Sequence, residues 1–326
     1  MLRNVVYFLF ILALLVSCQK TDDVFLINTP PHFPGLPIPA DNPPTLAKIQ
    51  LGKALFFDNR LSLDSTLNCS SCHLPNYAFS DTLALSLGVN GTQGKRNAPS
   101  LVNSAYGTLF NKDGGVIKLD IFAMLPIEDH LEMHLPIRKL VKRLSTDEGM
   151  QAQSIAAFGQ DLNPYVITRA LSSYVRTLIS KDSKYDRFVQ GEDSLSIAEE
   201  RGQLLFLSSK NNCSSCHSGM LFTNHEFENN GTKSTYKDQG RKLVTGKESD
   251  RGKFKVPSLR NVELTAPYMH DGSFNTLDEV LDHYNQGGSN HINKSDLIKP
   301  LQLSQQDKND IVAFLKTLTD KKYNNY

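Results

Sequence analysis

The stretch Cys69-Ser70-Ser71-Cys72-His73 decides how the rest of the chain is interpreted, because the same five residues return at Cys213-Ser214-Ser215-Cys216-His217. A Cys-x-x-Cys-His run is the attachment signal for c-type haem. Its two thiols add to the haem vinyl groups, and the histidine that follows can bind the iron. We therefore predict two covalently bound haem c groups, one on each pentapeptide, with His73 and His217 as iron ligands.

Two other sites could use the same cysteines. Two Cys-x-x-Cys pairs could hold a zinc ion, but that arrangement leaves the histidine after each pair unexplained. A disulfide framework is less favoured, since a bridge across two residues is strained. The repeated histidine therefore favours haem over both.

The fifth cysteine, Cys18, lies at the end of a leader-like pattern that begins with a single cation, Arg3. The apolar run from Val5 to Val16 has 12 residues, which is too short to cross a bilayer and fits the core of a secretory signal. Leu15-Val16-Ser17-Cys18 resembles a bacterial lipobox. We predict a signal peptide over residues 1–17 and a lipid on Cys18, with an ordinary signal peptide as the alternative.

A lipid on Cys18 would tether an otherwise soluble body to a membrane surface. Haem attachment also takes place outside the bacterial cytoplasm, so the predicted location is periplasmic or outer-membrane-attached. The chain has 35 Lys and Arg against 34 Asp and Glu, and removing Arg3 with the signal leaves 34 against 34. This balance gives no reason to expect a nucleic-acid partner.

The 326 residues are enough for two domains, and an internal repeat supports that number. Seven of the 15 prolines lie between Pro30 and Pro44, which predicts an extended tether over residues 18–45. Leu51-Gly52-Lys53 precedes the first haem motif and Arg201-Gly202-Gln203 the second. The glycines are 150 residues apart and the first cysteines 144. We predict related domains at residues 46–190 and 191–326.

Helix signals dominate the rest of the sequence. An apolar stripe predicts one helix from Thr45 to Asp58, and Asn163 with Pro164 predicts another that runs to Ser180. Further helices are predicted to open at three capping residues, which are Ser196, Thr276 and Ser304. Alternating strand patterns are absent from the sequence. The predicted fold is mostly α, with two cytochrome c-like domains that each hold one c-type haem and a haem-to-haem interface between them.

From about Leu51 to Leu318 the chain resembles the bacterial dihaem cytochrome c peroxidases, including the MauG-type enzymes of methylamine utilisation. The resemblance rests on both haem motifs and on a set of stretches in the family's order: Leu51-Gly52-Lys53 with Leu55-Phe56-Phe57-Asp58, Arg96-Asn97-Ala98-Pro99-Ser100, Pro126-Ile127-Glu128 with Glu132-Met133, Val256-Pro257-Ser258-Leu259-Arg260-Asn261 and Ala266-Pro267-Tyr268-Met269-His270-Asp271-Gly272.

The resemblance implies an enzyme that reduces hydrogen peroxide to water. The haem at His73 would react with peroxide. The haem at His217 would relay electrons from a small donor, which could be a c-type cytochrome, a cupredoxin or a quinol-linked protein. Two alternatives remain open: a MauG-like peroxide-dependent oxidase that modifies a protein or organic substrate, and a non-catalytic electron-transfer cytochrome.

Cleavage of the peroxide O–O bond needs an open coordination site and a base that moves a proton from one oxygen to the other. Glu132 matches the family's acid–base residue, with Glu128 and Asp129 as rivals. By the same resemblance, Tyr284 is the sixth ligand of the second haem, as in the MauG-type enzymes. Met269 is the rival ligand, with His283 weaker.

The family also holds a calcium ion between its domains. The resemblance assigns it the side chain of Asn97 and the carbonyl oxygens of Thr265 and Pro267, a set of oxygen ligands that suits Ca²⁺. His270 receives a supporting polar role near the second haem. The other histidines considered are predicted to be surface or core residues: His130, His134, His225 and His291.

Three positions depart from the family pattern. Val89 stands where many peroxidases carry a histidine that blocks the resting haem, so we expect no such block. Phe122 replaces a glutamine beside the acid–base residue, which removes one hydrogen-bond partner. Lys112 replaces a tryptophan between the haems, and the chain has no Trp at all. Electron exchange would then use direct tunnelling or another aromatic such as Tyr106 or Phe110.

Overall fold

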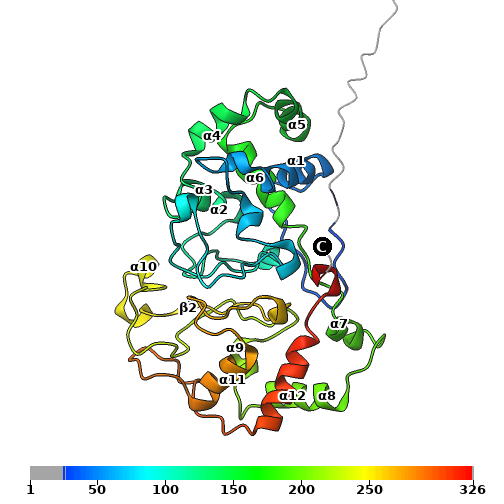
Figure 1. The fold of residues 1–326 in the computed structure, drawn as a ribbon. Coiled ribbons are helices and arrows are strands. Elements are labelled where there is room, and N and C mark those ends of the chain that lie inside the picture. Colours follow the sequence, from blue (N-terminus) through cyan, green and yellow to red (C-terminus); the bar gives the residue numbers. More distant parts are fainter. Residues whose placement is uncertain (1–24, 26, 325–326) are drawn as a thin grey trace, which may run out of the picture.

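The computed structural model describes residue 25 and residues 27–324 in two lobes (Figure 1), so Cys18 and the predicted signal peptide lie outside the described residues. The paired strands are β1 (Phe227–Glu228) and β2 (Phe254–Lys255), which run antiparallel. Helices and irregular loops form the rest of the described chain. The prediction of a mostly α fold with two lobes is confirmed.

The helices divide between the lobes as the repeat predicted. The N-terminal lobe contains α1 (Leu46–Phe56), α2 (Leu119–Phe122), α3 (Met124–Glu128), α4 (Ile137–Leu144), α5 (Glu148–Phe158) and α6 (Pro164–Val175). After α7 (Lys184–Val189), the C-terminal lobe contains α8 (Ile197–Leu207), α9 (Cys213–Cys216), α10 (Lys242–Thr245), α11 (Leu277–Gln286) and α12 (Gln305–Lys316).

The predicted capping residues open their helices. The side chains of Asn163, Ser196, Thr276 and Ser304 each accept a hydrogen bond from the backbone N–H three residues later. These bonds satisfy donors that would otherwise be unpaired at a helix start. Helices α4 and α5, by contrast, were not predicted from the sequence.

The repeated glycine explains how each lobe is built. A Cβ on Gly52 of α1 would lie 1.9 Å from the carbonyl oxygen of Ala170 in α6. A Cβ on Gly202 of α8 would lie 1.9 Å from the carbonyl oxygen of Asp310 in α12. In each lobe, therefore, the helix before the haem motif crosses a later helix backbone to backbone. Only glycine permits this approach.

We expect Gly52→Ala to lower the free energy of unfolding by about 1–3 kcal/mol, since overpacking forces two backbones apart. Gly202→Ala should have a similar effect in the other lobe. Gly35→Ala is the control, because a Cβ at that position would have no neighbour within 4 Å. Urea unfolding of the haem-loaded variants measures the change. If the Gly52→Ala and Gly35→Ala variants had equal free energies of unfolding, α1 and α6 would be able to move apart without loss of stability, which would contradict the prediction.

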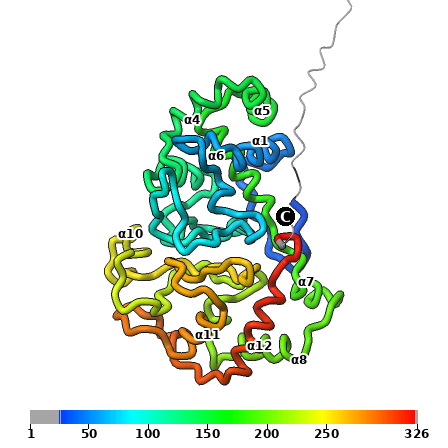
Figure 2. The backbone as a smooth tube through the Cα atoms, viewed as in Figure 1, coloured from blue at the N-terminus to red at the C-terminus, as the bar shows by residue number. Residues whose placement is uncertain are grey.

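Besides the stretch of chain that runs from one lobe to the other, two segments lie at the junction of the lobes: the residues before α1 and the residues after α12. The sequence predicts an extended tether over residues 18–45. In its described part, two side chains are packed against the protein: Phe33 is 8% exposed and Asn42 is fully buried. The chain end returns to the junction of the lobes (Figure 2), where Tyr323 is buried in the core of the N-terminal lobe. At Phe33 and Asn42, the described part of the segment before α1 is therefore anchored to the folded body.

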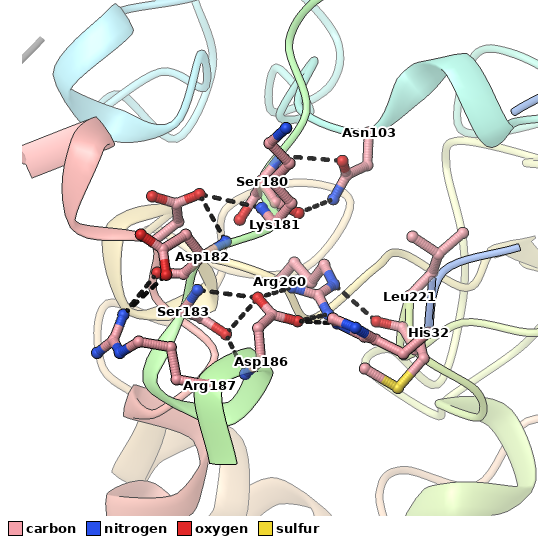
Figure 3. A network of polar contacts seen from close by, with 12 residues as sticks. His32, Asn103, Ser180, Lys181, Asp182, Ser183, Asp186, Arg187, Leu221 and Arg260 are labelled. Atoms are coloured by element: carbon pink, nitrogen blue, oxygen red, sulfur yellow. Dashed lines mark hydrogen bonds and ion pairs between the residues drawn. The ribbon is translucent and has the colours of Figure 1, made fainter. Parts of the chain in front are cut away.

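Between the lobes, Asp186 of α7 forms a buried ion pair with Arg260 (Figure 3). The two Asp186 oxygens accept from the Arg260 guanidinium at 2.7 and 2.9 Å. Ser183 adds two hydrogen bonds to the same carboxylate, and His32 contacts its other oxygen at 3.2 Å. The Arg260 guanidinium also lies over the Phe33 ring, 4.5 Å from its centroid. This cluster fixes the N-terminal segment and α7 to the C-terminal lobe.

Candidate functional site

The two haem-motif histidines have the same environment. Nδ1 of His73 lies 3.0 Å from the carbonyl oxygen of Phe79, and Nδ1 of His217 lies 3.1 Å from that of Phe222. A carbonyl can only accept, so Nδ1 carries the proton in each ring and Nε2 keeps its lone pair for a metal. Burial lowers the pKa of both imidazoles, which also favours the neutral, metal-binding form.

The residue before each of these phenylalanines is held by a loop whose repetition was not recognised in the sequence. Phe79 and Phe222 are both buried, with φ values of 55° and 52°. The hydroxyl of Ser100 donates to the carbonyl of Ala78, and that of Ser258 donates to the carbonyl of Leu221, each at 2.6 Å. The signal was available as a second repeat, Pro-Ser-Leu at residues 99–101 and 257–259.

Two asparagines complete the repeated support. Asn103 and Asn261, at φ values of 59° and 60°, follow the two Pro-Ser-Leu stretches. The Asn103 side chain accepts from the backbone of Ser180, beyond α6, and the Asn261 side chain accepts from Asp320, beyond α12. Each Pro-Ser-Leu loop is thus hydrogen-bonded to the segment that follows a long helix of the same lobe, which is α6 in the first lobe and α12 in the second. His73 and His217 rest on these fixed loops.

The residues fit covalent haem in both lobes. Cys69, Cys72, Cys213 and Cys216 are free thiols, so none is consumed by a disulfide. The two pairs lie in different lobes, against different cores, which does not suit one zinc ion shared between them. Within the described residues no group of three or more His, Cys, Asp or Glu could hold a metal.

In the N-terminal lobe the structure brings Val89 and Glu132 together. The Val89 N–H donates to the carbonyl of Glu132 at 2.8 Å. The neighbouring Gly88 approaches so closely that a Cβ there would lie 2.0 Å from the carbonyl oxygen of Leu131. The loop that contains Val89 is therefore fixed against the segment that contains Glu132. This contact links two positions singled out separately in the sequence.

The Glu132 carboxyl has an unusual pKa. Desolvation by the surrounding protein, followed by the negative charge of Asp129, raises its pKa to about 7. The residue keeps an exposed surface, so its carboxyl is within reach of solvent protons. A carboxyl that titrates near neutral pH can both accept and return a proton there.

The two rival carboxylates have structural partners. Glu128 Oε1 accepts from the backbone N–H of Ile137 at 2.9 Å, at the start of α4. Asp129 Oδ1 accepts from the backbone N–H of Leu131 at 2.8 Å. Phe122 packs on Phe110 with ring centroids 6.0 Å apart. Glu128 and Asp129 thus hold the backbone on either side of the turn that carries Glu132.

Lys112 lies at the boundary between the lobes. Its Nζ donates to the carbonyl of Met269 at 3.2 Å, and its own carbonyl accepts from the Lys255 backbone at 2.7 Å. Burial lowers the pKa of both lysines to about 8. Nearby, the Asn97 N–H donates to the carbonyl of His270 at 2.9 Å. Lys112, which we predicted to replace a tryptophan, is therefore a half-buried lysine at the boundary between the lobes.

The two candidate ligands of the second haem lie beside each other. The side-chain amide of Asn230 donates to Met269 Sδ at 3.1 Å and reaches Tyr284 Oη at 3.4 Å. Burial raises the pKa of the Tyr284 phenol to about 12, although the Asn230 hydrogen bond opposes the shift. His283, the weaker candidate, donates from Nε2 to the Asn230 carbonyl at 2.9 Å. Sequence reasoning missed Asn230.

The remaining histidines occupy varied places. His270 stacks on Phe254 with centroids 4.0 Å apart, and burial lowers its pKa to about 4. His291 accepts from the Asn229 side chain at 3.1 Å. His130 and His134 are exposed, with ring centroids 6.5 Å apart. The aromatics considered for electron exchange are both buried, Tyr106 against Phe33 and Phe110 against Phe122.

Comparisons with known proteins agree with this geometry. A family model described as di-haem cytochrome c peroxidase matches residues 46–194, and a cytochrome c model matches residues 199–319. The methylamine utilization protein MauG of Methylorubrum extorquens is 36% identical over 291 residues, covering 87% of this chain and 81% of that protein. Cytochrome-c peroxidase IdrP1 of Denitromonas iodatirespirans is 36% identical over 321 residues, covering 88% and 85%.

A solved structure is also similar. The crystal structure of a MauG-like protein associated with microbial copper homeostasis matches with a TM-score of 0.87 and 35% identity. The match covers 91% of this chain and 96% of that one.

Proposed function

The chain belongs to the di-haem cytochrome c peroxidase family that includes MauG, and from this we propose that it is a dihaem c-type peroxidase that reduces hydrogen peroxide to water. A haem held by His73 would supply the iron that reacts with peroxide, and a haem held by His217 would supply electrons received from a small redox donor. The observation that carries the proposal is the contact between Val89 and Glu132 in the lobe of His73. This backbone contact supports Glu132 as the acid–base residue next to Val89, whose side chain cannot bind iron.

The protein's own residues perform the proton chemistry. Reduction consumes two electrons and two protons per peroxide and gives two waters. Glu132 takes a proton from one peroxide oxygen and returns it to the other, which becomes the leaving water. The backbone bond from Val89 holds Glu132 in place, and His73 is oriented by the Phe79 carbonyl. When bound to His73, a haem would supply an open iron site and the electrons for the reduction of peroxide.

Calcium and the lipid anchor are further parts of the proposal. Asn97 is buried at the lobe boundary, and its amide nitrogen already donates to the carbonyl of Leu83 at 3.1 Å. That bond leaves its side-chain oxygen for a cation, with the carbonyls of Thr265 and Pro267 as the other protein ligands. Lipidation of Cys18 would place the protein in the periplasm or on the outer membrane. No helix among the described residues is long and apolar enough to cross a bilayer.

A MauG-like oxidase is the second candidate, because Tyr284 is held in the second lobe by Asn230. A phenolate ligand favours ferric iron over ferrous, whereas a thioether does the reverse. With Tyr284 bound, the haem at His217 would accept electrons poorly and would share oxidising equivalents with a protein or organic substrate. The half-buried Lys112 between the lobes, where a tryptophan would serve electron exchange, works against such sharing, so peroxidase remains the first proposal.

The test uses the purified protein with both haems attached. We expect peroxide-dependent oxidation of a reduced small c-type cytochrome, and cyanide binding to the fully oxidised protein at the N-terminal haem. Relatives with the blocking histidine need prior reduction of the other haem. Cyanide binding only after one-electron reduction would mean that another side chain blocks the iron. No peroxide turnover with any donor, with both irons six-coordinate, would favour the electron-transfer cytochrome.

A further inference from the structure

One amide group contacts both candidate ligands of the second haem. The Asn230 nitrogen has two hydrogens, and it donates to Met269 Sδ at 3.1 Å and to Tyr284 Oη at 3.4 Å. The sulfur and the phenol oxygen therefore face the same point from two elements, the loop before Phe274 and helix α11. Only one of them could serve, together with His217, as a ligand of a haem bound in this lobe.

The oxygen of the Asn230 side chain is held by Thr232, on the side away from Met269 and Tyr284. Its Oδ1 accepts from both the hydroxyl and the backbone N–H of Thr232, the latter at 3.3 Å. This leaves the amide nitrogen directed at Met269 and Tyr284. Its carbonyl accepts from His283 Nε2 at 2.9 Å, on the same helix as Tyr284.

Gly287 and Gly288, which follow α11, allow the end of this helix to lie close to the loop that contains Asn230. A Cβ on Gly288 would lie 3.0 Å from the Asn230 carbonyl oxygen and 3.2 Å from that of Gly231. Ser289 also donates to the Gly231 carbonyl at 2.7 Å. The end of α11 and the Asn230 loop thus form one unit, so Asn230 cannot drift away from Tyr284.

Met269 is held in an unusual conformation. Its φ of 79° lies in the left-handed region, which is unfavourable for a residue with a side chain. The Lys112 ammonium holds its carbonyl, and Asn230 holds its sulfur. A sulfur whose lone pair accepts a hydrogen bond is less available to a metal. The Asn230 contact to Met269 Sδ, at 3.1 Å, is shorter than that to Tyr284 Oη, at 3.4 Å, so the amide holds the sulfur more closely than the phenol.

We propose that Asn230 is a positioning residue that withholds the Met269 sulfur from the haem at His217 and thereby makes Tyr284 its ligand. The inference rests on the proposed function in requiring a haem on His217, and a Tyr284 ligand there favours the second candidate, the MauG-like oxidase, over a haem that relays donor electrons. Loss of a hydrogen bond between neutral groups shifts an equilibrium by roughly two- to tenfold. Removing the amide should shift the ratio of tyrosine-bound to methionine-bound haem by that factor.

The experiment records near-infrared and EPR spectra of the ferric protein with both haems attached. Wild type should lack the methionine–iron charge-transfer band. Asn230→Leu, which keeps the size but removes the donor, should gain it. The added Met269→Leu substitution should abolish the band. Thr232→Val, which only frees the Asn230 side chain to rotate, should gain a weaker band and serves if Asn230→Leu does not fold.

Asn309→Leu on the exposed face of α12 is the matched control and should keep the wild-type spectrum. A wild-type spectrum in both Asn230→Leu and Thr232→Val overturns the inference, and so does a methionine band already present in wild type. Peroxide turnover is measured on the same samples. Normal turnover with unchanged spectra rejects only the role of Asn230, whereas absent turnover in wild type rejects the proposed function.

Discussion

Glu132→Gln is expected to keep both haems and the fold but to lose peroxide turnover by about a hundredfold or more, which is the typical effect of removing a positioned acid–base group. The fold should survive because the contacts that place Glu132 are made by its backbone. Its carbonyl accepts from Val89 and its N–H donates to Asp129. Steady-state kcat/KM for peroxide measures the loss, with haem content measured on the same sample.

Glu128→Gln is the matched control for this substitution. Glu128 accepts the first N–H of α4, so its loss should lower stability slightly and leave turnover near normal. Near-normal turnover in Glu132→Gln, with a large loss in Glu128→Gln, would move the acid–base role to Glu128. The same comparison with Asp129→Asn tests the other rival.

The raised pKa of Glu132 also predicts the pH profile. The residue must be deprotonated to accept the first proton, and its pKa is raised to about 7. The rate constant kcat/KM for peroxide should therefore be flat above that pH and fall about tenfold per unit below it. The Glu132→Gln variant should lack this limb. A wild-type profile that stays flat down to about pH 5 would place the working pKa near the usual value for a carboxyl.

Much of the fold was predictable because its signals are local. The haem pentapeptides, the four capping residues and the glycine of each first helix can all be recognised within a few neighbouring positions. The pairing of Gly52 with Ala170, and of Gly202 with Asp310, gives the physical reason for the 150-residue repeat. The helices α4 and α5 were missed.

What the sequence could not show is long-range contact. Tyr323 belongs to the core of the first lobe although it lies near the end of the chain, and Phe33 packs under Arg260. Both appear in sequence as isolated aromatics. Asn230 was missed for the same reason, because its partners Met269 and Tyr284 are 39 and 54 residues away. The proline loops under the histidines were missed despite a readable repeat.

The other large effect is expected at the junction of the lobes. Arg260→Met should lower the free energy of unfolding by about 3–5 kcal/mol, because it leaves the carboxylate of Asp186 buried without its cation. Both side chains are nearly inaccessible, at 1% for Arg260 and 0% for Asp186. Arg187→Met is the control: its guanidinium pairs with the more exposed Asp182 and Asp193, and such pairs contribute about 0–1 kcal/mol.

The pH dependence separates loss of the ion pair from loss of packing. Burial alone would raise the pKa of Asp186, but the hydrogen bonds and charge of Arg260, with Ser183, lower it below the usual value. The ion pair therefore stabilises the wild type above the carboxyl's unfolded pKa, and this contribution disappears as pH falls through the folded pKa. The difference in free energy of unfolding between wild type and Arg260→Met should therefore become smaller in acid, since a protonated Asp186 needs no cation.

Urea unfolding at neutral and acid pH measures this difference. A loss of stability in Arg260→Met equal to that in Arg187→Met would contradict the prediction. A gap that persists unchanged in acid would instead assign the loss to packing of the guanidinium over Phe33, 4.5 Å from the ring centroid.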